Sequence, residues 1–326
     1  MKIITNKIDD VFSKELFNNN TALIVSSSFE KRAFTISRML CNNDNVSSVF
    51  VISTDYNLSI AENAKTFRSM FGEKTKNISV IKDDPFSQLA EAYKISSELI
   101  GKKIDKIIVD ITTFTHETLL ILFNVFYKKK LLKKTYFFYN SAKEYCPETQ
   151  DSNKWLSKGC KEVRTILGYP GLLIPNRQTC MIILVGFEHE RASRLVSLTD
   201  PDSLYVGCGI ISDQHITSEK HIGPMKVFEE MYKSFFATRV NVHRFDFSAR
   251  NIDNTVRALQ EVIVKTKEYN HIIVPMNTKI STIATGLIAL QFPAIQLCYA
   301  EPETYNFDNY STPDDNVIGF QCFFNE

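Results

Sequence analysis

Two stretches of the sequence follow the same pattern, and this internal repeat constrains the fold more than any other feature. Residues 23–33 and 182–192 each begin with an apolar run, continue through small residues and Phe-Glu, and reach Arg-Ala where a helical pattern opens. Further on, Y-N-S-A-K-E-Y begins at Tyr139 and Y-A-E-P-E-T-Y begins at Tyr299. Phe29 precedes Tyr139 by 110 positions, and Phe187 precedes Tyr299 by 112. Landmarks in the same order at nearly equal spacing indicate two homologous halves. The alternative is a chance likeness between common strand-to-helix patterns.

Each half alternates short apolar runs with segments of helical periodicity. Such alternation predicts a parallel sheet covered by helices on both faces. The predicted fold class is therefore α/β, with two homologous Rossmann-like, doubly wound parallel-sheet halves that form an intramolecular pseudo-dimer. We expect a first domain at residues 1–150, a connector at 151–178 and a second domain at 179–326.

Several local patterns make more specific predictions. Ser27 and Glu30 match a capping box that would open a helix over residues 29–40. Asp84 and Pro85 predict the start of another helix, which Gly101 would end. The sequence also suggests helices over residues 158–167 and 225–236. Residues 128–134 hold five lysines, typical of a solvated helix end, with a phosphate-binding patch as the alternative. The acidic tail from residue 301 would form a capping loop or dock onto something basic.

Composition excludes several classes of protein. The chain has 326 residues, 38 Lys plus Arg against 37 Asp plus Glu, and 44% hydrophobic residues. This composition is typical of a globular protein, and the near-zero net charge does not indicate direct nucleic-acid binding. No apolar run reaches the length needed to span a bilayer, and the N-terminus has no secretory pattern. The seven cysteines are scattered and form no C-x-x-C pair, so reduced thiols in a cytoplasmic protein are expected.

Polar residues follow the first strand of each half, where doubly wound sheets bind ligands. In the first half the loop holds Ser27, Ser28 and Glu30, and Arg32 follows one turn into the helix. Glu188 and Arg191 take the same places in the second half. Small residues at a helix N-terminus leave N–H groups that hold an anion, and the arginines would reach a phosphate. The structural alternative is a plain capping box.

The loops after the fourth strand are also rich in hydroxyl groups. The first half has Asp110 followed by polar residues, and the second half has a Thr-Lys pair that suits a phosphate or carboxylate. An N-cap with a solvent-facing lysine is the alternative for that pair. Asp55, after the second strand, is in a place where acidic residues bind ribose hydroxyls. The candidate residues of the two fourth-strand loops are Asp110, Thr112, Thr113, Thr115 and His116, and Asn277, Thr278 and Lys279.

Common catalytic and cofactor motifs are absent from the sequence. It has no P-loop, no G-x-S-x-G and no H-E-x-x-H, which disfavours classical NTPases, α/β-hydrolases and zincins. Gly207 and Gly209 begin a partial G-x-G-x-x-G, but the third glycine is a serine and the motif follows the second strand. We predict no metal site and no cofactor.

The fourth-strand loops resemble a motif of CARF domains, the Rossmann-like sensors of cyclic oligonucleotides in CRISPR-associated proteins. That family carries Asp-x-Thr-Gly-Gly-Thr-Lys after its fourth strand. The first half matches at Asp110, Thr112 and Thr115, with His116 in place of lysine and without either glycine. The second half matches at Thr278 and Lys279 and lacks the aspartate. CARF domains dimerise around their ligand. The resemblance therefore implies one asymmetric composite site in the cleft between the halves, lined by residues 110–116 and 277–279.

Three functions follow as expectations. The first is a nucleotide-binding protein, which the resemblance extends to cyclic-oligonucleotide sensing in a prokaryotic defence system, with protein partners of that system. The second is an enzyme acting on a phosphorylated nucleoside or sugar, as a hydrolase, transferase or ring nuclease. In that enzyme Glu30, Glu188 or Asp110 would act as general base or orient the ribose, and Lys279 and Arg191 would stabilise developing charge. The third is a scaffold subunit of a larger complex that binds no ligand.

Overall fold

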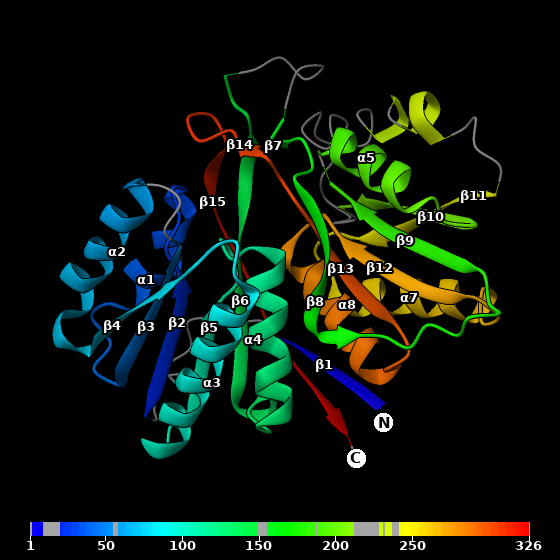
Figure 1. Ribbon diagram of the computed structural model, residues 1–326. Coiled ribbons are helices and arrows are strands. Elements are labelled where there is room, and N and C mark those ends of the chain that lie inside the picture. Colours follow the sequence, from blue (N-terminus) through cyan, green and yellow to red (C-terminus); the bar gives the residue numbers. More distant parts are fainter. Residues whose placement is uncertain are drawn as a thin grey trace. The chain divides into compact units, whose positions relative to one another are not determined.

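The computed structural model describes residues 2–8, 20–54, 58–148, 155–186, 188–211, 228–230, 232–236 and 241–325. It divides into two compact units, each with its own sheet (Figure 1). Residues 1–144 and 311–326 form the first unit, and residues 145–310 form the second. No described helix is both long and apolar enough to cross a membrane.

The first unit is built around a seven-stranded sheet in the order β1-β15-β6-β5-β2-β3-β4. Strands β2 to β6 run parallel in the doubly wound order, and β1 pairs antiparallel with β15 at the edge. The strands are β1 (Lys2–Ile8), β2 (Thr21–Ser26), β3 (Val46–Thr54), β4 (Thr75–Val80), β5 (Lys106–Asp110), β6 (Thr135–Tyr145) and β15 (Ser311–Asn325). The helices are α1 (Thr35–Leu40), α2 (Leu58–Phe71), α3 (Pro85–Gly101) and α4 (His116–Lys128).

The second unit repeats this plan with a six-stranded sheet in the order β11-β10-β9-β12-β13-β8. Its first five strands in that order are parallel, and β8 is antiparallel at the edge beside β13. The strands are β8 (Glu162–Pro170), β9 (Thr179–Val185), β10 (Ser203–Ile210), β11 (Val242–Ser248), β12 (Asn270–Pro275) and β13 (Gln296–Glu301), with β7 (Ser157–Lys158) and β14 (Thr304–Tyr305) forming a separate two-stranded ribbon. The helices are α5 (His189–Thr199), α7 (Ile252–Lys265) and α8 (Lys279–Gln291), with a π-helical turn at Tyr232–Phe236.

The predicted fold class is confirmed for each half, because both units are α/β with a parallel sheet; the pseudo-dimer stays a prediction. Residues 21–25 of β2 and 180–185 of β9 are all buried. Successive side chains of a strand point to opposite faces, so both faces of each sheet must be covered. In the first unit α3 packs on α4, and in the second α7 packs on α8. The predicted helix start at Asp84 and Pro85 is also confirmed, because Asp84 accepts a hydrogen bond from the Phe86 N–H.

The predicted domain boundaries differ from the two observed units. The tail forms β14 and β15, and β15 belongs to the first unit, next to β6. The described part of the connector belongs to the second unit, where β8 extends the sheet. The helix predicted over residues 158–167 was wrong: Val163, Thr165 and Ile166 are β-branched and lie in β8. A half-exposed edge strand has no continuous apolar run, so its pattern is ambiguous in the sequence.

The predicted capping box at Ser27 and Glu30 was also wrong. The Ser27 hydroxyl donates to the Ile60 carbonyl (2.6 Å), and no side chain caps the 3₁₀ turn Lys31–Phe34 that precedes α1. Asp55 lies outside the described residues, as does part of the helix predicted over residues 225–236.

Candidate functional site

The strand order places a topological switch point in each unit, beside the first and fourth parallel strands. The crevice outside the carboxyl ends of these two strands is where doubly wound sheets bind ligands. In the first unit these are β2 and β5, and the Thr113 hydroxyl joins their loops by donating to the Ser26 carbonyl (2.8 Å). In the second unit they are β9 and β12, joined where Asn277 Nδ2 donates to the Val185 carbonyl (2.6 Å). The two loops that the sequence analysis named in each half therefore lie side by side.

Asp110 ends β5 and is the titratable group at the switch point of the first unit. Its Oδ1 accepts hydrogen bonds from the Thr112 N–H (3.0 Å) and the Thr112 hydroxyl (2.5 Å), while its buried Oδ2 has no partner among the described residues. Burial raises the pKa of Asp110 to about 7, although the Thr112 hydrogen bonds and the charge of Arg32 oppose the shift. A carboxyl group with such a pKa exchanges its proton near neutral pH.

Glu30 and Arg32 form a buried ion pair beside Asp110. Arg32 Nη2 lies 2.7 Å from Glu30 Oε2, and the two side chains are 4% and 7% exposed. Arg32 Nε donates to Glu30 Oε2 (2.9 Å) and to Ser311 Oγ (3.0 Å), and Nη1 donates to the Asn140 carbonyl (3.0 Å). The Ser311 hydroxyl completes the network by donating to Glu30 (2.7 Å). Each nitrogen of Arg32 thus donates within its own unit, so the predicted phosphate contact would compete with these bonds.

The remaining candidates of the first unit have structural partners. Ser28 Oγ accepts from the Glu30 N–H (3.2 Å). Thr115 is the N-cap of α4, accepting from the Thr118 N–H (3.0 Å). His116, the first residue of α4, is buried. Thr112 links to β6 because its hydroxyl accepts from the Asn140 N–H (3.0 Å).

Glu188 and Arg191 occupy the corresponding place in the second unit. Arg191 Nη2 lies 3.6 Å from Glu188 Oε2, and the side chains are 3% and 9% exposed. The Ser157 hydroxyl donates to Glu188 Oε1 (3.2 Å), as Ser311 does to Glu30. Buried Arg191 Nε has no hydrogen-bond partner in the described part of the chain. A guanidinium in this state is under-satisfied, because buried donors are nearly always hydrogen-bonded.

Arg191 interacts electrostatically with three tyrosines as well as with Glu188. Burial alone would lower the pKa of Arg191, but Glu188, together with Tyr299, Tyr305 and Tyr310, raises it above its ordinary value. Burial raises the pKa of Tyr305, and the Arg191 cation opposes that shift. Arg191 is therefore held as a cation next to phenol rings. Glu188 is the N-cap of α5, but its side chain accepts no hydrogen bond from the N–H groups of the first turn. Those N–H groups therefore lack a side-chain cap.

The fourth-strand loop of the second unit is held in place by its own residues. Thr278 is the N-cap of α8, accepting from the Ser281 N–H (3.3 Å), and its hydroxyl donates to the Ala249 carbonyl (2.8 Å). Lys279 is the first residue of α8 and is partly exposed. A Cβ on Gly209 would lie 2.8 Å from Asn277 Nδ2, so a glycine at this position makes room for the Asn277 side chain. Both Gly207 and Gly209 lie inside β10, which rules out a phosphate loop at the partial G-x-G-x-x-G.

Sequence reasoning missed the residues that complete both networks. Asn140 directly follows Tyr139, and Tyr299 and Tyr305 stand in the repeat itself, so a signal was present. These residues served there only as landmarks of the duplication. Ser157 and Ser311 had no such signal, because their strands come from the presumed connector and tail.

No family model and no curated protein matches the chain. Among solved structures it is similar to the NADPH-bound carbonyl reductase from chicken fatty liver, at 16% identity, a TM-score of 0.29, and coverage of 38% of this chain and 52% of that one. The chain thus spans about half the length of that reductase. It is also similar to the leucoanthocyanidin reductase–NADPH complex from Vitis vinifera, at 11% identity, a TM-score of 0.26, and coverage of 84% and 88%. Likenesses this low carry no argument about function, and the fold rests on the strand order.

Proposed function

We propose that the protein binds a nucleotide or another phosphorylated small molecule at the carboxyl ends of its parallel strands, with Arg191 of the second unit as the main anion contact. The state of Arg191 carries this proposal. It is a buried cation whose Nε has no hydrogen-bond acceptor among the described residues and whose Nη2 lies 3.6 Å from Glu188 Oε2. Leaving such donors unsatisfied is costly, and phosphate oxygens accept from a guanidinium in bidentate fashion.

The surroundings of Arg191 suit a nucleotide. α5 begins at His189, two residues before Arg191, and the N-terminus of a helix favours negative charge. Arg191 interacts electrostatically with Tyr305 and Tyr310, which are both half-buried, and with the buried Tyr299. Phenol groups combine an apolar ring with a hydroxyl group. A phosphate would pair with the guanidinium, and a base or sugar would contact the tyrosines.

Sensing of a cyclic oligonucleotide in a prokaryotic defence system is the finer form of this proposal. The resemblance to CARF domains supports it, and so do the matching N-caps of the two fourth-strand loops. Thr115 caps α4 and is followed by His116, and Thr278 caps α8 and is followed by Lys279. The composite site between the halves stays a prediction from the sequence.

Calorimetric titration of the full chain with a ligand panel tests the proposal. The panel contains nucleoside mono- and diphosphates, linear and cyclic oligoadenylates, and inorganic phosphate. At least one nucleotide should bind, and Arg191→Lys should weaken it by about ten-fold or more, because an ammonium loses the bidentate fork. Lys279→Ala should weaken it several-fold.

Arg32→Lys is the matched control, because Arg32 already donates to Glu30, Ser311 and Asn140. It should leave the affinity within about two-fold of the wild type. The double variant Glu188→Gln/Arg191→Met removes both charges, so a loss of binding there cannot come from an unpaired buried glutamate. Unchanged affinity in both Arg191 variants would overturn the proposal. If no ligand gives a thermal shift, the scaffold alternative is favoured.

The raised pKa of Asp110 favours a second candidate function, an enzyme acting on a phosphorylated nucleoside or sugar. A buried carboxyl with a pKa of about 7 suits general acid–base catalysis near neutral pH. Incubation with the same labelled panel separates the two candidates. A product that the wild type forms and Asp110→Asn does not form supports the enzyme, and binding without product supports the sensor.

A further inference from the structure

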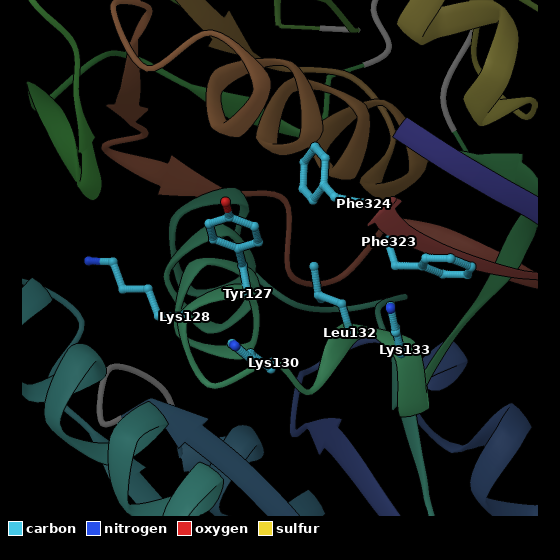
Figure 2. A pocket seen from close by; sticks show the side chains of 7 residues that line it. All are labelled: Tyr127, Lys128, Lys130, Leu132, Lys133, Phe323 and Phe324. Carbon is cyan, nitrogen blue, oxygen red and sulfur yellow. The ribbon is translucent and has the colours of Figure 1, made fainter. Parts of the chain in front are cut away.

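The first unit has a pocket at the end of its sheet opposite to the switch point. It has a volume of about 360 Å³ and is lined by Tyr127, Lys128, Lys130, Leu132, Lys133, Phe323 and Phe324 (Figure 2). These residues come from the end of α4, the turn that leads into β6, and the end of β15. The turn precedes the amino end of β6, whereas Asp110 stands at the carboxyl end of the parallel strand β5. The pocket is therefore distinct from the candidate site.

Apolar side chains form one part of the pocket. Leu132 is 4% exposed and Phe324 is 7% exposed. The Tyr127 and Phe324 rings meet edge to face with centroids 5.2 Å apart. Gln321 Nε2 donates to the Lys133 carbonyl (2.7 Å), which ties β15 to the lysine turn. The apolar part is thus a packed surface shared by two segments that are far apart in the sequence.

The five lysines of residues 128–134 divide into two groups. Lys129 lies over the Tyr93 ring, 5.3 Å from its centroid, and Lys134 donates to the Ile104 carbonyl (3.1 Å). The other three, Lys128, Lys130 and Lys133, are exposed and line the pocket. None of these three ammonium groups has an ion pair or hydrogen bond with the residues that the structure describes, and none of the described residues that line the pocket is acidic. In Figure 2, Leu132 lies between Lys130 and the Phe324 ring.

Lys130 stands where a glycine would be the more favourable residue. Its φ is 57°, in the left-handed region, and the bond from the Leu131 N–H to the Phe126 carbonyl (2.8 Å) closes the end of α4 around it. Glycine adopts this conformation without steric cost. Lys103, with φ 51°, takes the same place after α3 and does not line the pocket. The two lysines offer a matched pair for testing whether the pocket depends on its cation.

We propose that this pocket binds a small organic anion, with an apolar or aromatic body against Leu132 and Phe324 and a phosphate or carboxylate head group between Lys130 and Lys133. Binding pockets typically combine an apolar lining with a few charged groups, and this volume suits a small ligand. Lysine binds phosphate or carboxylate as a point charge, and no arginine in the lining selects a planar head group. The site does not depend on the proposed nucleotide site.

Calorimetric titration of the full chain with 1-naphthyl phosphate and 1-naphthoate tests the proposal and distinguishes the two head groups. At least one of them should bind with a Kd below about 1 mM. Inorganic phosphate and 1-naphthol, which carry only the head group or only the body, should each bind at least about ten-fold more weakly. Raising NaCl from about 50 mM to about 500 mM should weaken the naphthyl anion several-fold.

The variants separate a built site from general charge attraction. Lys130→Gly/Lys133→Gln should weaken the anion by about ten-fold or more while the Tm stays equal or rises, because the glycine relieves a left-handed lysine. Lys103→Gly/Lys74→Gln removes the same net charge elsewhere and should keep the wild-type affinity. The proposal is overturned if the wild type binds neither naphthyl anion. It is also overturned if the pocket variant binds as the wild type does, or if the control pair loses affinity equally.

Discussion

The two units hold a glutamate and an arginine at the same place in the same fold, yet the arginines are in opposite states. Glu30 and Glu188 follow the first parallel strand, and each accepts from a serine hydroxyl of a segment outside the parallel core. Arg32 donates to a carboxylate, a hydroxyl and a carbonyl. Arg191 has a 3.6 Å ion pair, and its Nε has no hydrogen-bond acceptor in the part of the chain that the structure describes.

The fourth parallel strands of the two units also differ, and here the first unit holds the ionisable residue. The last residue of β5 is Asp110, and the last residue of β12 is Pro275. One unit thus holds an under-satisfied carboxyl group at its switch point, and the other holds an under-satisfied cation. A common frame can therefore carry two different chemistries, with the first unit suited to proton exchange and the second to anion binding.

The largest expected effect is the loss of Arg32. Arg32→Ala leaves Glu30 buried and unpaired, and such a change typically costs about 3–5 kcal/mol. Arg191→Ala should cost less by about 1–3 kcal/mol, because it also removes an under-satisfied guanidinium. Hydrogen exchange measured by mass spectrometry on the full chain reads the two units separately, through the opening free energies of peptides from α1 and α5.

The matched double variants Glu30→Gln/Arg32→Met and Glu188→Gln/Arg191→Met control for the unpaired carboxylate. Removing both charges should restore most of the loss in the first unit. Equal losses for Arg32→Ala and Arg191→Ala would contradict the distinction between the two arginines.

A pH-dependent stability is expected from the Asp110 carboxyl group of the first unit. The pKa of Asp110 is raised from 3.8 to about 7 in the folded state. Between these values the unfolded chain is ionised while the folded chain keeps its proton, so the free energy of unfolding falls as pH rises. Three pKa units correspond to roughly 4 kcal/mol. Asp110→Asn should therefore be more stable than the wild type at about pH 8 and lose that advantage near pH 4.

Urea unfolding of the full chain at several pH values measures this difference. Asparagine keeps an oxygen that can accept from Thr112, so the local hydrogen bonds are preserved. An advantage of Asp110→Asn that does not change with pH would show that the carboxyl group is already ionised in the folded state.

Much of the fold could be predicted because buried parallel strands appear as continuous apolar runs. Residues 107–109 and 272–274 are examples, and the strands there are central in their sheets. The edges could not be predicted in the same way. β8 and β15 are antiparallel or edge strands with half-exposed side chains, and their pairing is decided by segments far away in the chain.

The candidate sites were predictable to the level of the loops and no further. Residues after the first and fourth strands meet because the doubly wound order requires it, which brings Thr113 to Ser26 and Asn277 to Val185. The states of Arg32 and Arg191 depend on whether a carbonyl such as that of Asn140 comes within reach. That is a matter of tertiary distance, which residue spacing along the chain does not encode.

The smallest expected difference concerns the two threonine N-caps. Thr115→Ala and Thr278→Ala each remove a cap, which typically costs about 1 kcal/mol. The Thr278 hydroxyl also donates to the Ala249 carbonyl, which loses this donor in Thr278→Ala. The Thr115 hydroxyl also bonds to the Thr118 hydroxyl, but Thr118 keeps its own bond to Gln88 in Thr115→Ala. The loss for Thr278→Ala should therefore exceed that for Thr115→Ala by about 0.5–1.5 kcal/mol. Serine at either position keeps the hydroxyl and should stay within about 0.5 kcal/mol of the wild type. Exchange rates at the first turns of α4 and α8 measure these differences. Equal losses would mean that the bond to Ala249 adds no stability, and the fourth-strand loops would then differ only in the residues they offer to a ligand.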